Sequence, residues 1–154
     1  MAALSSAREG RWDKVAASLY QLIVEHQEPL VDGIVKDAIG QIPAYAKAPL
    51  RETMARVEQA LQAIADSVRE NDPDLLEQYL VGVAQERREE GYAILELHAI
   101  VHIIERHVSG LIRATCPDQV ERNARLALLG AVMDAARMAL SVRYLLSSGT
   151  PPSP

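Results

Sequence analysis

Histidines are the residues of this chain that could support the widest range of chemistry, and two of the four stand at a metal-binding spacing. His98 and His102 lie four residues apart, so on a helix both imidazoles lie on the same side. Glu105 lies on the same side and extends this pair into a polar strip. A zinc or iron site here would need a further histidine or carboxylate from elsewhere in the chain. The sequence has neither a His-Glu-x-x-His motif nor a second histidine pair. We therefore predict a polar, solvent-exposed strip and no metal site.

The other two histidines, His26 and His107, each fall on an apolar face of a predicted helix. Such a side chain is either a hydrogen-bonded core histidine or part of a ligand pocket, and both interpretations stay open for this pair. The alternative function is therefore a sensor that binds haem or a small ligand through His26 or His107. A haem pocket usually packs aromatic rings against the porphyrin, whereas this chain has no Phe and 4% aromatic residues. We predict that the chain binds no haem and no other cofactor.

Residues suited to nucleophilic or redox catalysis are sparse. Cys116 is the single cysteine, which excludes an internal disulfide and any site with several thiolate ligands. It precedes Pro117 at a predicted helix start, where a thiolate is favoured, so it is interpreted either as a redox sensor or as an inert thiol. The sequence has no Gly-x-Ser-x-Gly motif and no phosphate-binding glycine loop. We predict that the protein is not an enzyme.

The composition indicates one soluble domain. The chain has 154 residues, 49% of them hydrophobic and 24% charged, which is sufficient for one core. The net charge of -5 provides no positive surface for nucleic acid, and the longest apolar run is too short to cross a bilayer. The first residues lack the basic start and apolar stretch of a secretory signal. We therefore expect a cytoplasmic protein that binds neither nucleic acid nor a membrane.

Two long apolar stripes with the three- and four-residue spacing of amphipathic helices indicate an all-α fold. One stripe spans 50–68 and the other 94–111, and the chain has no strand-like alternation. We predict a compact bundle of five or six helices whose main seam joins these two helices. The predicted folded domain covers residues 12–146, between a flexible N-terminus at 1–11 and a disordered Pro- and Ser-rich tail or linker at 147–154.

The last predicted helix, from about Pro117 to Leu146, is apolar on more than one side. A helix that is apolar on two sides needs two partners, and one of them is the core of its own domain. Alanines recur at every fourth position along the helix and leave a groove that another helix can approach closely; they are Ala127, Ala131, Ala135 and Ala139. We predict that these alanines form a homodimer interface.

The segment 86–97, with an Arg-x-x-x-Gly-aromatic core formed by Arg87, Gly91 and Tyr92, resembles the N-terminal domain of stressosome co-antagonist proteins of the RsbR type. It is also similar to related helical sensor modules of bacterial regulators, which precede STAS, histidine-kinase or helix-turn-helix output domains. Residues 45–52 fit the same pattern, and the resemblance extends over nearly the whole predicted domain.

The resemblance implies a globin-like helical domain without haem that dimerises and passes a signal through its last helix to an output domain or a regulatory protein. Within the motif, we expect Arg87 to pair with a neighbouring carboxylate where the helix breaks, and Gly91 to let the chain bend there. The most consistent function is a bacterial sensor or protein-interaction module that takes part in signal transduction and the stress response. The rival hypothesis is a purely structural dimerisation module, which predicts no ligand pocket.

Overall fold

The computed structural model describes the backbone of residues 2–148 and the side chains of residues 10–142. Over the described backbone the chain forms seven helices and no strand, which confirms the predicted all-α class. No helix in this part of the chain is both long enough and apolar enough to cross a bilayer. The helices are α1 (Ala2–Glu25), α2 (Gln27–Gln41), α3 (Pro43–Lys47), α4 (Leu50–Glu70), α5 (Asp74–Glu89), α6 (Ile94–Thr115) and α7 (Gln119–Ser148).

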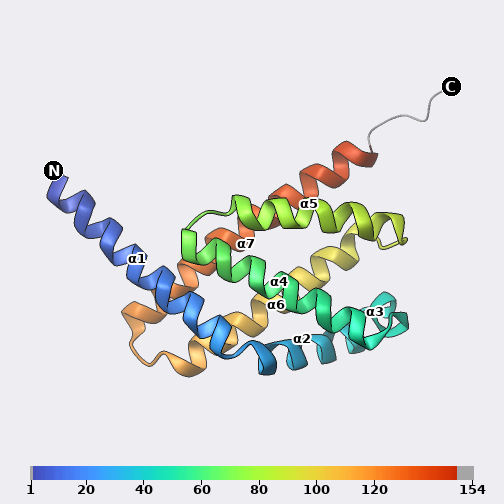
Figure 1. Ribbon diagram of the computed structural model, residues 1–154, viewed down its shortest axis with the longest axis horizontal. Coiled ribbons are helices and arrows are strands. Elements are labelled where there is room, and N and C mark those ends of the chain that lie inside the picture. Colours follow the sequence, from blue (N-terminus) through green and yellow to red (C-terminus); the bar gives the residue numbers. More distant parts are fainter. Residues whose placement is uncertain (1, 149–154) are drawn as a thin grey trace.

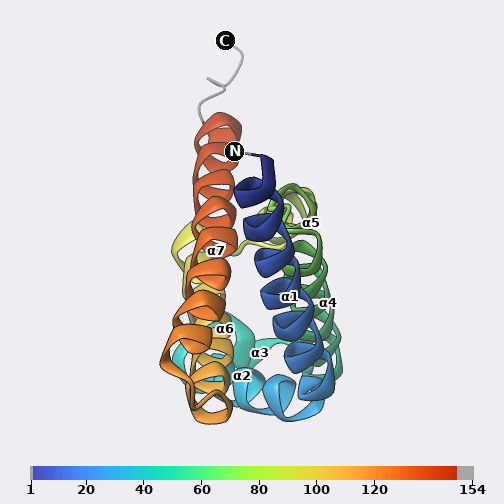
Figure 2. The ribbon, with the colours of Figure 1, turned by 90° about the vertical axis from the view of Figure 1, so that its left-hand side faces the viewer.

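The helices form two crossed layers. α1, α4 and α5 lie on one side of the molecule, and α6 and α7 lie on the other (Figures 1 and 2). α2 and α3 run across one end and join the two layers (Figure 2). Within the layers α4 packs on α1 and α5, and α6 packs on α7, while α5 packs on α7 between the layers. The interior between the layers is filled mainly by Leu, Ile, Val and Ala side chains.

Short breaks in the sequence set the directions of the helices around this interior. Asn71 caps the C-terminal end of α4, and its left-handed φ of 49° reverses the chain. In the turn that follows, Asp72 Oδ1 accepts a hydrogen bond from the backbone N–H of Asp74 at 3.0 Å. Because only two residues separate this turn from α5, α5 folds back against α4. α5 ends before Gly91, which adopts a φ of 90° that a glycine reaches without steric cost. The predicted bend at Gly91 is confirmed.

The predicted main seam between the two amphipathic helices is wrong. α4 packs against α1, α2 and α5, whereas α6 packs against α7 and α2. Their apolar stripes face the same interior from opposite layers, and Val57 of α4 and Ile104 of α6 line one small cavity there. The periodicity of a stripe identifies which face of a helix is buried, but it carries no information about the partner of that face.

The described residues form seven helices, whereas five or six were predicted. His26 separates α1 from α2, and α3 is a separate helix of five residues. α1 begins at Ala2, within the segment predicted to be flexible, and α7 continues to Ser148, past the predicted domain end. Residues 149–154 of the predicted tail lie outside the described residues.

A polar contact ties α2 to α6 away from the interior. Asp37 Oδ2 accepts hydrogen bonds from His107 Nε2 at 2.6 Å and from Arg106 Nη2 at 3.1 Å. The hydrogen bond from His107 is the main cause that holds the pKa of Asp37 below its usual value, and Arg106 adds to it. The two helices approach closely because Gly33 has no side chain, since a Cβ there would lie 2.9 Å from His107 Cε1.

We expect the substitution Ile104→Ala to destabilise the fold by about 2–5 kcal/mol, because Ile104 is only 4% exposed and its removal enlarges a cavity. Urea denaturation measures this loss. His102→Ala, an exposed position on the same helix, is the control and should change stability by less than about 0.5 kcal/mol. An equally small change for Ile104→Ala would contradict the packing of α6.

The substitution Asp37→Asn tests the contact between α2 and α6 through its pH dependence. A carboxyl whose pKa is lower in the folded state stabilises the protein above its unfolded pKa, and this stability is lost as the pH falls through the folded pKa. Asp37→Asn should therefore lower the urea midpoint at about pH 7 and have a shrinking effect as the pH falls below about 4. A difference from the unmodified protein that is constant across this range would contradict the assignment.

Candidate functional site

A small cavity lies between α4, α5 and α6, and single residues of α3 and α7 complete its wall. Its volume is about 50 Å³, which is far below the roughly 300 Å³ at which pockets for drug-sized ligands begin. The wall is almost entirely apolar, apart from two tyrosines and two arginines, Arg56 and Arg87. The apolar residues are Val57, Ala60, Leu80, Val83, Ala84, Leu97, Ile100, Val101, Ile104 and Leu140.

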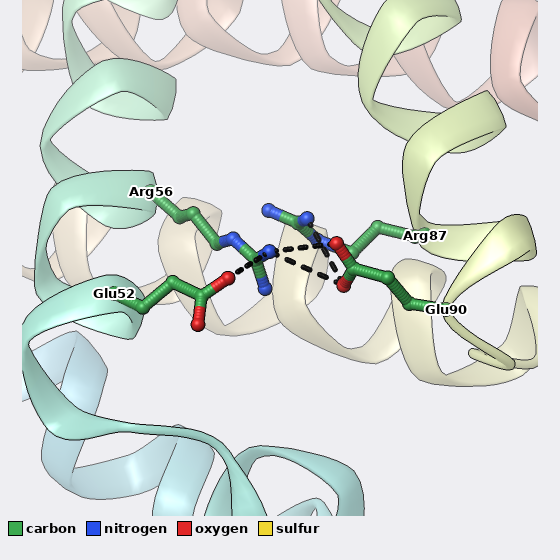
Figure 3. Close-up of polar contacts among 4 residues, drawn as sticks. All are labelled: Glu52, Arg56, Arg87 and Glu90. Atoms are coloured by element: carbon green, nitrogen blue, oxygen red, sulfur yellow. Dashed lines mark hydrogen bonds and ion pairs between the residues drawn. The ribbon is translucent and has the colours of Figure 1, made fainter.

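Arg87 is the charged residue that is most deeply buried among the described side chains, with 3% of its surface exposed. Its Nη1 atom lies 3.5 Å from Oε2 of Glu90, at the end of the same helix. The same carboxylate accepts hydrogen bonds from Arg56 Nη2 across the gap between α4 and α5, at 2.9 and 3.2 Å, and Arg56 also pairs with Glu52 (Figure 3). The predicted pairing of Arg87 with a neighbouring carboxylate is confirmed.

These four side chains form a charge-balanced cluster at the edge of the cavity. Two guanidinium groups face two carboxylates, and Glu90 is shared by both arginines (Figure 3). A buried guanidinium is costly unless a carboxylate and hydrogen bonds compensate for its lost hydration. Arg56 has two carboxylate partners at or below 3.2 Å, whereas Arg87 has one contact at the outer limit of a hydrogen bond. The Arg87 guanidinium has Tyr45 as a further hydrogen-bond partner and lies against the Tyr92 ring, so carboxylate and aromatic groups together compensate for its burial.

Three tyrosines surround the buried guanidinium. The Tyr92 ring lies 5.9 Å from Arg87 Cζ, and the Tyr45 and Tyr92 ring centroids are 5.3 Å apart. Burial raises the pKa of Tyr45 to about 12 against the opposing charge of Arg87, and burial also raises the pKa of Tyr79. The Tyr79 hydroxyl donates to the backbone carbonyl of Arg56 at 3.3 Å. Both phenols that line the cavity are therefore neutral at physiological pH.

The structure does not bring the predicted metal-ligand strip together as a site. His98 Nε2 lies 3.1 Å from Ser141 Oγ, and Glu105 forms an ion pair with Arg137 of α7. His102 is exposed on the outer side of α6. Among the described residues, no group of three histidine, cysteine or acidic side chains is arranged to hold a metal ion.

His26 and His107 both lie outside the cavity. His26 Nδ1 lies 2.9 Å from the Leu22 carbonyl oxygen at the break between α1 and α2, and His107 binds Asp37. Both side chains are half-buried, so each is a hydrogen-bonded residue between helices and neither is a fully buried core residue. Cys116 is buried beside the turn before α7, with its Sγ 3.8 Å from the Asp118 carbonyl oxygen.

The four predicted interface alanines lie along one side of α7. Ala127 and Ala131 are exposed, and Ala135 and Ala139 are half-buried. Sequence reasoning missed the large exposed residues on the same side, which are Met138 and Val142, with exposed fractions of 71% and 48%. Their spacing of four residues was the signal that could have identified them.

The fold is similar to that of the globin domain of E. coli DosC, which was solved in its ferric form. The two structures superpose with a TM-score of 0.70 over 88% of this chain and 99% of that domain, at 13% sequence identity. The chain therefore has a globin-like fold, as the resemblance implied, while the assignment to the RsbR type stays a prediction. No protein-family model and no curated protein match the chain.

The residues around the cavity do not fit the haem that a globin-like fold implies. Among the described side chains, no histidine, cysteine or methionine lines the cavity, and the raised pKa of Tyr45 disfavours the phenolate that could serve as an axial ligand. The cavity is also much smaller than a porphyrin requires, because Arg87, Tyr79 and the aliphatic side chains of α5 and α6 fill the interior. Sequence reasoning named Arg87 as a motif residue, but it did not identify Arg56, Glu52 and Glu90 as its neighbours.

Haemin titration tests this conclusion. We expect no stoichiometric Soret band when haemin is added to the purified protein, because the cavity offers neither the volume nor an axial ligand. A saturable band that is lost in His26→Ala, His107→Ala or Tyr45→Phe would contradict this expectation and restore the haem-sensor alternative.

Proposed function

We propose that this chain is a non-enzymatic sensory domain of a bacterial regulator, which forms a homodimer through α7 and relays the state of its cavity to an output domain or partner protein. The globin-like fold and the apolar cavity support a sensory role, in line with the resemblance found in the motif around Arg87. The observation that carries the proposal is the position of α7, because this helix contributes both to the cavity wall and to an exposed apolar surface.

The inner side of α7 contacts the cavity. Leu140 is 2% exposed and forms part of the cavity wall, and α7 packs against α5, the helix that carries Arg87. A change in the size or occupancy of the cavity therefore acts on the packing of α7 directly. Small shifts of a packed helix are a common way in which helical domains transmit a change of state.

The outer side of α7 carries what we call the dimer stripe, a row of apolar residues that follows the helical repeat. It consists of Ala127, Ala131, Ala135, Met138, Ala139 and Val142. A contiguous apolar surface on a small protein is typical of an interaction site. Small residues along the stripe allow two copies of α7 to approach closely, which favours a symmetric dimer.

Sedimentation equilibrium at micromolar concentration tests the dimer. We expect a mass about twice the 16.9 kDa of the chain, and the substitution Ala131→Glu should shift the protein toward the monomer, because it places a charge in the middle of the dimer stripe. Ala55→Glu introduces the same charge at an exposed position of α4, in the other layer, and should leave the mass unchanged. A monomeric protein, or an equal effect of both substitutions, would overturn the proposed interface.

A further inference from the structure

We propose that two copies of the chain pair through antiparallel α7 helices centred on Ala131, so that α1 of each copy packs against α5 of its partner. This inference rests on the proposed homodimer and specifies the surface and the register of that contact. Three observations carry it, which are two grooves on the same side of α7, the spacing of the exposed apolar residues along that helix, and the opposite charges of the two grooves.

Two grooves border α7, one toward each end of the helix. The first lies between α1 and the start of α7 and has a volume of about 760 Å³, and its wall includes Trp12 and Val120, with exposed fractions of 41% and 63%. The second lies between α5 and the later part of α7, has a volume of about 290 Å³ and is lined in part by Val81 and Val142. Ala124 of the first groove and Val142 are eighteen residues apart, which is about five helical turns. Both grooves therefore open on the side of α7 that carries the dimer stripe.

The apolar residues on this side of α7 are placed symmetrically about Ala131. Ala124 and Met138 lie seven residues on either side of it, and Val120 and Val142 lie eleven residues on either side. A two-fold axis through Ala131, perpendicular to α7, therefore brings the protruding Met138 of one copy, which is 71% exposed, into the first groove of the other. A parallel pairing would instead press the two Met138 side chains together and leave both first grooves unfilled. The shapes of the two ends of α7 thus favour the antiparallel pairing.

The two grooves carry complementary charges. Arg11 and Lys14 are exposed on the α1 wall of the first groove, and Glu77 lies on the α5 wall of the second. None of these three side chains forms an ion pair with another described side chain. The axis through Ala131 places the first groove of one copy over the second groove of the other. The two cations of α1 therefore face Glu77 of the partner subunit, and this contact occurs twice in the dimer.

The carboxylates of the first groove do not cancel this complementarity, because they are engaged within the chain. Glu121 pairs with Arg125 at 3.1 Å, and Asp118 Oδ2 accepts a hydrogen bond from the backbone N–H of Glu121 at 3.4 Å. Both carboxylates lie on the α7 wall, whereas the cations lie on α1. The wall that packs against α5 of the partner is therefore the positive one.

Cross-linking of the full chain with a short bismaleimide tests the register. In a Cys116→Ser background, which removes the single native thiol, Ala124→Cys and Met138→Cys each introduce one thiol. We expect a covalent dimer when these two variants are mixed and none from either variant alone, because the two copies of position 138 lie about 21 Å apart along antiparallel helices. Ala131→Cys, on the axis, should cross-link with itself. Leu50→Cys, at an exposed position of α4, is the control and should cross-link in no combination.

Charge reversal tests the contact between α1 and α5. Lys14→Glu and Glu77→Lys should each weaken the dimer by roughly tenfold in sedimentation equilibrium, because each places like charges at both symmetric contacts. An equimolar mixture of the two variants should recover the affinity of the unmodified protein, since the mixed dimer has opposite charges at both contacts. Lys36→Glu reverses a charge at an exposed position of α2 and should leave the affinity unchanged.

The outcomes separate this inference from the proposed dimer. If the protein is dimeric but Ala124→Cys and Met138→Cys each cross-link with themselves, or their mixture does not cross-link, the antiparallel register is overturned and the dimer stands. Charge-reversal variants that do not complement each other overturn the contact between α1 and α5. A protein that stays monomeric in sedimentation overturns both the dimer and this inference. Circular dichroism of each variant identifies any loss of fold, and the two sets of substitutions do not depend on each other.

Discussion

Burial of the Arg87 guanidinium is the constraint on which the arrangement of the interior depends. A guanidinium removed from water requires a carboxylate nearby, and Glu90 meets this requirement from the end of the same helix. Because Glu90 also binds Arg56, the cost of burying one charge is offset by a contact that joins α5 to α4. The left-handed turn at Gly91 ends α5 at the residue where this carboxylate is needed. The motif of arginine, glycine and tyrosine thus acts as one structural unit.

This unit also explains how a globin-like fold is compatible with an interior so different from a haem pocket. The volume between α4, α5 and α6 is occupied by Arg87, two neutral tyrosines and aliphatic side chains, which leave a cavity of about 50 Å³. Burial keeps the phenols of Tyr45 and Tyr79 protonated, so the polar groups at the cavity are hydrogen-bond donors and cations. Such a site offers no ligand to a metal porphyrin among the described residues.

α7 connects this interior with the surface of the molecule. Its inner residues, among them Leu140 and Met133, are buried, while Met138 is largely exposed on the opposite side. Polar contacts along its boundary with α6, from Ser141 to His98 and from Arg137 to Glu105, hold the helix in register. His98 and Glu105, which were predicted to lie in an exposed polar strip, therefore contribute to helix packing. The proposed dimer and the proposed relay both follow from the two-sided character of this one helix.

The all-α class, the amphipathic faces of α4 and α6, the bend at Gly91 and the pairing of Arg87 were determined by the sequence alone, because each depends on neighbours within a few residues. The partner of each buried face was decided only by the tertiary structure, and the predicted seam between α4 and α6 was therefore wrong. His107 shows the same limit, since its partner Asp37 is seventy positions away in the chain. The cluster of Glu52, Arg56 and Glu90 likewise depends on how α5 folds back on α4. Side-chain types and spacing determine local geometry, but contacts between distant segments depend on the packing of the whole chain, because many helices present similar apolar faces.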